Sequence, residues 1–528
     1  MKNIIIFSEN NKFVSTVFNR KFLKKNDLNL NCVVAVKHEL NLIKETFDKI
    51  DLFTHENFEK GNLSNINNLN TNQLDESILK KYSDIEILSN KFLDFYNPNG
   101  NKFSLRETRQ AYYNSLLFVL NFLSKYRPNV VFFSNVPHSF TGIILALVCK
   151  KEKIQYIFKR EISIPGRFIF QNDFFNNNFD DKTSKVDNYF KNIIDENNLF
   201  FNIYINKVLE NDHKGIKKIF SSKRDHFLIN NIDYVKKFNI FFFTILLVRQ
   251  LMIYFSKAVL QFLRDFFLYF FVSNKKYKNR IFLEDFWKNS KELFSNSSTL
   301  KISREIELLK GDIRKFNLLK IYNSKCKNIV LNKKFIYFPL HYQPEATTYP
   351  FGNYFIDQIN AIKLLSAHIP DDCEIYVKEH PDTFNIGRES WVIGDFSRDK
   401  NFYEELAAIK KVYLVGLNIN TLELINKSFA ISTIAGAVGL ESIIQNKPVF
   451  LFGNPWYKNC EGVYEFTNHD TCKKSIKEVF VEKKIINKNN VNNFFTKSKY
   501  SVFDDNNLFS IENLQFIQER FLERIITR

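Results

Sequence analysis

The chain has 528 residues and a formal net charge of +18, from 75 Lys and Arg against 57 Asp and Glu. At roughly 100 to 200 residues per domain, this length predicts about three structural units, which excludes a peptide hormone, a disulfide mini-protein and a single small binding module. Hydrophobic residues make up 45% of the chain, which has only 14 Gly and 11 Pro, so wholesale disorder and a collagen-like repeat are also excluded.

The first 160 residues alternate between strand and helix patterns. Short apolar runs predict buried strands at 3–8, 32–36, 129–134 and 155–159. Apolar residues at helical spacing predict helices at 11–24, 105–126 and 141–149. Between these, residues 48–104 are rich in Asn, Asp and Ser and predict loops and short helices. This alternation is typical of a parallel α/β sheet.

The alternation of strands and helices stops at residues 171–300. This segment is basic and very aromatic, and its pattern predicts helices. Within them, the longest uncharged run of 238–272 is 11 residues, whereas a membrane-spanning helix needs about 20. Arg249, Lys257 and Arg264 would lie within roughly 80° of one another on a helix that is otherwise mostly apolar. Two interpretations stay open: a helix lying in an anionic membrane interface, and a helical hairpin buried against the rest of the protein.

A second alternating series begins near residue 334. It predicts strands at 335–339, 374–378, 412–415, 429–432 and 448–452. It predicts helices at 354–367, 403–410, 421–426 and 438–445, and a C-terminal helix at 509–526. Five strands at this spacing indicate a doubly wound parallel sheet.

These patterns predict an α/β chain of two doubly wound, Rossmann-like units and a helical insert. The expected boundaries are 1–170 for the first unit, 171–300 for the insert, 301–500 for the second unit and 501–528 for a C-terminal helix. The insert is the segment that we expect to meet a membrane, if any does.

Polar residues and glycines follow three strands of the second series. The first is followed by His341-Tyr-Gln343-Pro-Glu345, the second by Lys378-Glu-His380-Pro381, and the fourth by Ser432-Thr433-Ile-Ala-Gly436-Ala-Val-Gly439-Leu-Glu441. Ligands of open parallel sheets bind beyond the carboxyl ends of the strands, so the three segments should converge on one cleft.

The last of these segments predicts a phosphate site. Hydroxyls and free backbone N–H groups at a helix N-terminus bind phosphate, and the carboxylate of Glu441 can accept hydrogen bonds from ribose hydroxyls. Each residue also has an ordinary interpretation, because X-Pro turns, tight strand-to-helix connections and a Glu in a first helical turn are common. Together they indicate a nucleotide site that requires no metal.

Several other signatures are missing from the sequence. It has no GxxxxGK[ST], no GxGxxG after the first strand, and no Asp-x-Asp of the kind that holds a metal for nucleotide-sugar diphosphates. Kinases, P-loop NTPases and ordinary dehydrogenases are therefore disfavoured. The six cysteines show no CxxC or zinc spacing, which is typical of reduced thiols in a cytosolic protein. The N-terminal apolar run of four residues is too short for a signal peptide.

The strand-end segments resemble those of the bacterial capsule polysaccharide biosynthesis family. The similar stretches are 337–348, 378–381, 432–441 and 447–457. That family includes the Kdo transferases of capsule assembly, and the Gln-Pro and His-Pro turns also resemble those of bacterial sialyltransferases. The resemblance implies a GT-B fold, in which two Rossmann-like domains face a cleft, with the donor nucleotide in the C-terminal domain and the acceptor mainly in the N-terminal one. The insert at 171–300 has no counterpart in it.

The resemblance also implies roles for individual residues. By position, Gln343 and His380 would line the donor pocket, with His380 near the donor phosphate. The residues that would hold the phosphate are Ser432, Thr433 and Gly436, and Glu441 would hold the ribose.

The catalytic group should come from the N-terminal unit of this architecture. Glycosyl transfer needs a carboxylate or imidazole to take the acceptor proton, or a carboxylate nucleophile if configuration is retained. His138 and Glu161 follow strands of the first series and are the candidates. The alternatives are a helix-entry residue for His138 and a surface ion pair with Arg160 or Arg167 for Glu161.

The sequence therefore predicts a cytoplasmic, metal-independent glycosyltransferase without a bound cofactor, peripheral to a membrane if 238–272 binds one. Its donor would be a nucleotide-sugar, expected to be a CMP-activated acidic sugar such as Kdo or another ulosonic acid, and its acceptor a capsule or surface glycan or glycolipid. The alternatives are a UDP- or GDP-sugar transferase, a polyol-phosphate transferase and a non-catalytic capsule export or assembly factor. Nucleic-acid binding is not expected, since no RRM, KH or helix-turn-helix pattern occurs.

Overall fold

The fold is seen in a computed structural model of the chain. The described residues are 1–37, 40–47, 50–59, 61, 74–95, 104–164, 166–175, 191–210, 252, 256, 313–343, 345–384, 398–498, 501–505 and 510–526. The predicted amphipathic segment 238–272 lies outside them, apart from Met252 and Ser256. Within the described part of the chain, every helix is too short or too polar to cross a bilayer.

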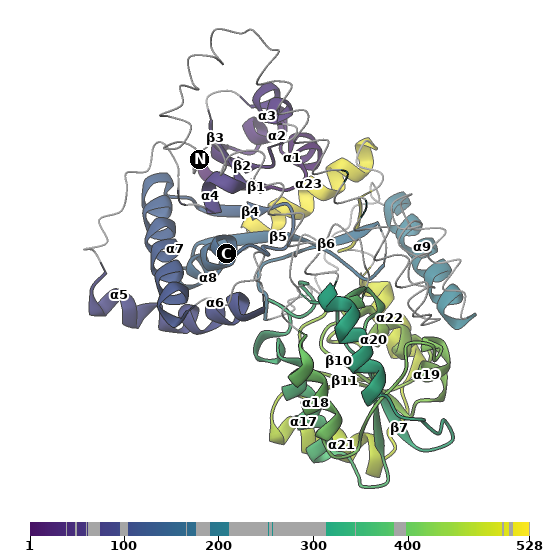
Figure 1. Ribbon diagram of the computed structural model, residues 1–528. Helices are drawn as coiled ribbons and strands as arrows, with labels where there is room; N and C mark the ends of the chain where they lie inside the picture. The colour runs from purple at the N-terminus through teal and green to yellow at the C-terminus, as the bar shows by residue number, and fades with distance from the viewer. Residues whose placement is uncertain are drawn as a thin grey trace.

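The N-terminal sheet has seven strands in the order β13-β6-β5-β4-β1-β2-β3 (Figure 1). Its parallel strands are β1 (Lys2–Ser8), β2 (Leu28–Ala35), β3 (Asp51–Thr54), β4 (Val130–Phe133) and β5 (Gln155–Glu161). Their order, 3-2-1-4-5, is that of a Rossmann-like sheet. Two antiparallel strands extend it, β6 (Arg167–Gln171) and β13 (Phe503–Asp504).

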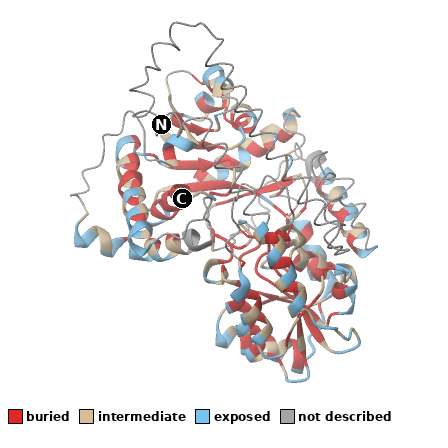
Figure 2. Cartoon of the chain, in the orientation of Figure 1, coloured by how far each residue is buried: buried red, intermediate tan, exposed pale blue. Residues whose placement is uncertain are grey.

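Helices cover both faces of this sheet, and most residues of its strands are buried (Figure 2). The helices are α1 (Asn11–Val17), α2 (Arg20–Lys25), α3 (Leu40–Thr46), α4 (His55–Glu59), α5 (Glu76–Lys81), α6 (Ser83–Phe95), α7 (Leu105–Tyr126), α8 (Phe140–Lys151) and α23 (Ile511–Ile526). Successive residues of a strand point to opposite faces. Accordingly, Ile4 packs with α1 and α23, whereas Ile5 packs with α7 and α8.

The C-terminal sheet has six parallel strands in the order β12-β11-β10-β7-β8-β9. They are β7 (Phe335–Pro339), β8 (Glu374–Lys378), β9 (Val412–Leu414), β10 (Ala430–Thr433), β11 (Val449–Leu451) and β12 (Val463–Glu465). This is the doubly wound order 3-2-1-4-5-6, in which the chain reverses direction between β7 and β10. The predicted fold class, two Rossmann-like doubly wound sheets in a GT-B-like arrangement, is confirmed.

The helices of the C-terminal half form two layers around this sheet. They are α17 (Gln358–His368), α18 (Lys400–Ala408), α19 (Thr421–Lys427), α20 (Ala437–Ile444), α21 (His469–Ile476) and α22 (Lys488–Ser498). One hydrophobic cluster joins the sheet to α17, α18 and α21, and the other joins it to α19 and α20. The second cluster also contains residues of α22 and of α9 (Lys191–Leu209), a helix within the predicted insert.

The end of the chain returns to the N-terminal sheet, where α23 lies across the first half of the molecule (Figure 1). β13 pairs with β6 beside ion pairs of 2.8 Å from Arg167 to Asp504 and from Lys159 to Asp505. Phe521 of α23 packs edge-on against Phe132 of β4. The last residues of the chain thus complete the N-terminal sheet.

Several local expectations were wrong. The helix expected at 11–24 is divided into α1 and α2, because the side chain of Asn19 accepts a hydrogen bond from the N–H of Phe22 and starts a new helix. The helix expected at 354–367 begins only at Gln358, where Asp357 caps it. The strands β3, β6, β12 and β13 were not expected; they lie at or next to the edges of their sheets.

Candidate functional site

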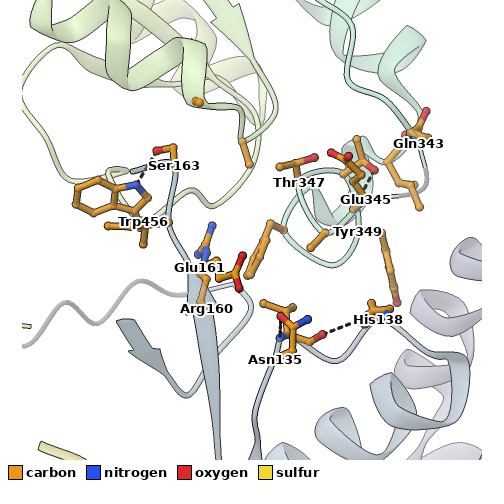
Figure 3. Close-up of a pocket in the computed structure, with 18 of the residues that line it drawn as sticks. Asn135, His138, Arg160, Glu161, Ser163, Gln343, Glu345, Thr347, Tyr349 and Trp456 are labelled. Atoms are coloured by element: carbon orange, nitrogen blue, oxygen red, sulfur yellow. Dashed lines mark hydrogen bonds between the residues drawn. The ribbon is translucent and has the colours of Figure 1, made fainter. Parts of the chain in front are cut away.

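A cavity of about 590 Å³ lies between the two sheets (Figure 3). Its N-terminal wall comes from the carboxyl ends of β4 and β5, and its C-terminal wall from the loops after β7, β10 and β11. The polar side chains that line it are Asn135, His138, Arg160, Glu161, Ser163, Gln343, Glu345, Thr347, Thr348, Tyr349, Trp456 and Tyr457. This is the edge at which parallel sheets bind their ligands.

His138 and Glu161, the two predicted catalytic residues, both lie in the N-terminal wall. The His138 side chain is half exposed, and its Nδ1 lies 3.0 Å from the carbonyl oxygen of Val136 and 3.5 Å from a carboxylate oxygen of Glu9. The Glu161 side chain is 72% exposed, and its carboxylate lies 3.6 Å from the ammonium of Lys159. Both residues are therefore accessible to a molecule in the cavity.

Arg160 connects the two halves of the chain across the cavity floor. Its guanidinium donates to the side chain of Gln171 at 2.8 Å and to the carbonyl of Asn454 at 3.0 Å. It also lies over the ring of Phe351, 3.5 Å from the ring centre. Burial lowers the pKa of Arg160. Trp456, which donates to the hydroxyl of Ser163 at 3.0 Å, makes a second connection between the halves.

Gln343 borders the cavity, yet its amide is held by the protein. Its oxygen accepts hydrogen bonds from Arg398 at 2.7 Å and from Gln358 at 3.0 Å, and its nitrogen donates to the carbonyl of Ile356 at 2.8 Å. The side chain is 1% exposed. These contacts fix the shape of the turn that carries Glu345 and Thr347 into the cavity wall.

Arg398 joins this turn to the one after β8. Its Nε lies 2.6 Å from the carboxylate of Glu379, and both side chains are buried. Tyr403 donates to the same carboxylate at 2.9 Å, and a guanidinium nitrogen of Arg398 donates to the carbonyl of His341 at 3.0 Å. A buried ion pair with several hydrogen bonds therefore ties the two Pro-containing turns together.

His341 packs beneath the N-terminus of α20. Its Nε2 accepts a hydrogen bond from the N–H of Ile434 at 3.2 Å and lies 3.0 Å from the hydroxyl of Thr433, so the ring proton resides on Nδ1. Burial lowers the pKa of His341 to about 3, helped by His380 and Arg398, which keeps the ring neutral at physiological pH.

Two glycines permit this close packing. A Cβ at Gly436 would lie 2.6 Å from Cε1 of His341, and a Cβ at Gly439 would lie 2.3 Å from the hydroxyl of Tyr457. The backbone of Gly436 starts α20 without a side-chain cap, so the first N–H groups of this helix have no capping side chain. Ala435 and Ala437, the neighbours of Gly436, line the cavity.

The other predicted donor-binding residues lie behind this wall. Ser432 and Thr433 are fully buried, and their hydroxyls contact the carbonyl of Phe450 and the ring of His341. His380 accepts a hydrogen bond from the N–H of Asp382 at 3.3 Å. Burial raises the pKa of the Tyr204 and Tyr457 phenols, and the charge of Glu441 adds to this effect. The donor-binding roles of these residues remain predictions.

Sequence reasoning missed three residues that shape the site: Glu9, Glu379 and Arg398. It gave Arg160 only as an ion-pair partner of Glu161, whereas Arg160 binds Gln171 and Asn454 and Glu161 lies beside Lys159. Glu9 and Glu379 stand at the carboxyl ends of strands, next to residues that the sequence analysis used, so their position was a usable signal. Arg398 lies far along the chain from its partners, so no local pattern could identify it.

Comparison with known proteins gives a family match and weak structural similarities. Residues 349–473 match the family model described as "Capsule polysaccharide biosynthesis protein". A search of curated proteins found no match.

Solved structures with some similarity include an epimerase and two transferases. A UDP-GlcNAc 2-epimerase from Methanocaldococcus jannaschii is 14% identical over 91% of this chain and 93% of its own, with a TM-score of 0.22. The Thermosulfurimonas dismutans KpsC, a beta Kdo 2,7 transferase, is 11% identical over 78% and 96%, with a TM-score of 0.25. A glycosyltransferase from Rickettsia africae is 10% identical over 99% and 97%, with a TM-score of 0.21.

The family match falls on the half of the chain that forms the C-terminal wall of the cavity. It spans α17, the buried ion pair, the turn after β10 and α20. The similarity to the capsule polysaccharide biosynthesis family that the turn motifs indicated is therefore confirmed for residues 349–473.

Proposed function

We propose that this protein is a glycosyltransferase of capsule or surface polysaccharide biosynthesis, which transfers a sugar from a CMP-activated donor, Kdo or another ulosonic acid, to a glycan or glycolipid acceptor. The family match supports the polysaccharide context. The CMP-linked donor rests on the resemblance of the Gln-Pro and His-Pro turns. The high net positive charge suits an anionic donor and an anionic polymer.

One observation carries the transferase proposal: the cavity places acid–base side chains of one sheet opposite a helix N-terminus of the other. His138 and Glu161 belong to the first wall, and Ala435 and Ala437, on either side of Gly436, the N-cap of α20, belong to the second. A helix N-terminus attracts phosphate, because its N–H groups and dipole favour negative charge. A donor with its phosphate at α20 would direct its sugar toward the N-terminal wall.

The proposed transfer breaks one bond, forms another and moves one proton. The bond between the anomeric carbon and the phosphate oxygen breaks, and CMP leaves with the electron pair. A bond from the anomeric carbon to the acceptor oxygen forms, and the acceptor proton passes to His138 or Glu161.

A panel of nucleotides in a thermal-shift assay tests the donor class. A ligand at 100 times its Kd stabilises the folded state by about 2.7 kcal/mol, so a bound nucleotide raises the unfolding midpoint measurably. We expect CMP to raise it and UDP, GDP and CDP to have little effect. A shift with UDP or GDP alone would instead support the corresponding sugar transferase. If no nucleotide shifts the midpoint, a non-catalytic export or assembly factor is favoured.

Substitutions in the N-terminal wall test the catalytic assignment. His138→Ala and Glu161→Gln should keep the CMP-induced shift, because neither residue lies in the nucleotide-binding half. At least one of the two variants should turn over the donor 100-fold more slowly or worse. A general base usually contributes a factor of about 10² to 10⁴ to the rate. Near wild-type rates in both variants would show that neither residue is the base.

A further inference from the structure

We infer that Glu9 is a positioning residue for His138, which it holds with Nδ1 protonated and Nε2 directed for proton transfer. The kinetic part of this inference rests on the proposed transferase function. Its structural part rests only on the geometry of the loops after β1 and β4, which are neighbouring parallel strands.

Glu9 is held in place from two directions. Its backbone N–H donates to the hydroxyl of Ser134 at 2.7 Å, immediately after β4. One carboxylate oxygen accepts a hydrogen bond from the side-chain amide of Asn135 at 2.9 Å, and the other lies 3.5 Å from Nδ1 of His138. The carboxylate is thus fixed between Asn135 and His138, which both line the cavity (Figure 3).

The contacts of Nδ1 determine which nitrogen of His138 carries the proton. The carbonyl of Val136, at 3.0 Å, can only accept a hydrogen bond, and so can the carboxylate of Glu9. Nδ1 is therefore the donor, and Nε2 keeps its lone pair. When Nε2 takes a proton from an acceptor hydroxyl, the ring becomes positively charged, and the nearby Glu9 carboxylate stabilises that charge.

The other charged groups around His138 are engaged differently. Glu59 of α4 accepts hydrogen bonds from the hydroxyl of Ser139 at 2.5 Å and from the N–H of Thr141 at 3.1 Å, and so caps α8. On β5, Glu161 lies beside Lys159, and the guanidinium of Arg160 is bound to Gln171. Glu345 lines the opposite wall of the cavity. Glu9 is the carboxylate that the structure places within ion-pair distance of the His138 ring, among the described residues.

Nitrogen NMR of the full-length protein with ¹⁵N-labelled histidine rings tests the geometry without requiring activity. The His138 signals are assigned by their loss in His138→Gln. At neutral to alkaline pH we expect Nδ1 to be protonated and Nε2 to be unprotonated. A dominant Nε2–H form would overturn the inference.

A double-mutant cycle tests the kinetic role. Glu9→Gln should lower kcat about three- to fivefold and leave the donor KM unchanged, because a half-exposed pair contributes modestly and mainly when the ring is charged. The same substitution in a His138→Ala background should change kcat by less than about twofold, since Glu9 acts through the imidazole. Glu9→Asp, which keeps the charge, should recover part of the rate. Glu76→Gln, on exposed α5, is the matched control and should match the wild type.

Two kinetic outcomes would overturn the role of Glu9. One is a wild-type kcat in Glu9→Gln, and the other is the same fold loss with and without His138. If the wild-type protein transfers sugar from no nucleotide-activated donor, the proposed function fails, and the NMR result still decides whether Glu9 and Val136 fix the ring.

Discussion

Removing one charge of the buried Glu379–Arg398 ion pair should lower the free energy of unfolding substantially. In Glu379→Gln, Arg398 would lose the carboxylate 2.6 Å from its Nε but keep the oxygens of Gln343 and His341 as acceptors. Breaking a buried ion pair by removing one charge costs about 3–5 kcal/mol. Because two acceptors of Arg398 remain, we expect the lower value, about 3 kcal/mol. For a unit of 150 to 250 residues, this lowers the unfolding midpoint by roughly 6–12 °C.

Scanning calorimetry of the full chain measures this effect, with an exposed pair as the control. Glu405 lies 2.5 Å from Lys363, and both side chains are 49% exposed. Exposed pairs contribute about 0–1 kcal/mol, so Glu405→Gln should shift the midpoint by no more than roughly 4 °C. Glu379→Gln should also weaken nucleotide binding, because the turns after β7 and β8 lose their common anchor. Equal midpoints for the two variants would refute the reasoning that burial makes the difference.

Three further predictions concern His341, Gly436 and the segment 238–272. Because the folded-state pKa of His341, about 3, is below the ordinary value of 6.5, the neutral ring contributes stability that is complete above pH 6.5 and is lost as the pH falls toward 3. Urea unfolding should therefore show that the wild type loses more stability between pH 7 and pH 4.5 than His341→Gln does. Equal losses in the wild type and the variant would contradict this. Gly436→Ala places a Cβ 2.6 Å from the His341 ring and should destabilise the protein by about 1–3 kcal/mol and reduce the nucleotide-induced thermal shift. Gly416→Ala is the control, because its new Cβ would contact only the side chain of Asn418. This substitution should have a smaller effect on the stability and on the nucleotide-induced thermal shift. If 238–272 binds membranes, the protein should float with anionic liposomes in a density gradient. Changing Arg249, Lys257 and Arg264 to Glu should abolish this flotation. A wild-type protein that does not float with the liposomes would contradict membrane binding.

The sequence predicted the main elements of both sheets because their strands are continuous apolar runs. β7 (Phe335–Pro339) and β8 (Glu374–Lys378) were predicted at their observed bounds, and so was the helix α7 (Leu105–Tyr126), which Ser104 and Glu107 cap reciprocally. β3 and β13 were missed because Asp51–Thr54 and Phe503–Asp504 carry too few apolar residues to form an apolar run. Their existence depends on pairing with β2 and β6 rather than on local sequence.

The candidate site was predictable where its residues directly follow strands. His138, Glu161 and Gln343 were identified in this way and line the cavity. The orientation of hydroxyls was not predictable, because Thr433 turns toward His341, a contact between residues 92 positions apart. The role of Arg398 likewise depends on folding, which brings it to Glu379 and Gln343.

The return of the chain end to the N-terminal sheet has a consequence for biosynthesis. A ribosome must make residues 1–502 before Phe503 can pair with Phe168 and before Phe521 can cover Phe132. The N-terminal sheet therefore emerges with the part of its apolar face that α23 covers still exposed, and it reaches its final form only after residues 501–526 have been made. Isolated N-terminal fragments that end before residue 501 should consequently aggregate unless 501–526 are supplied in trans.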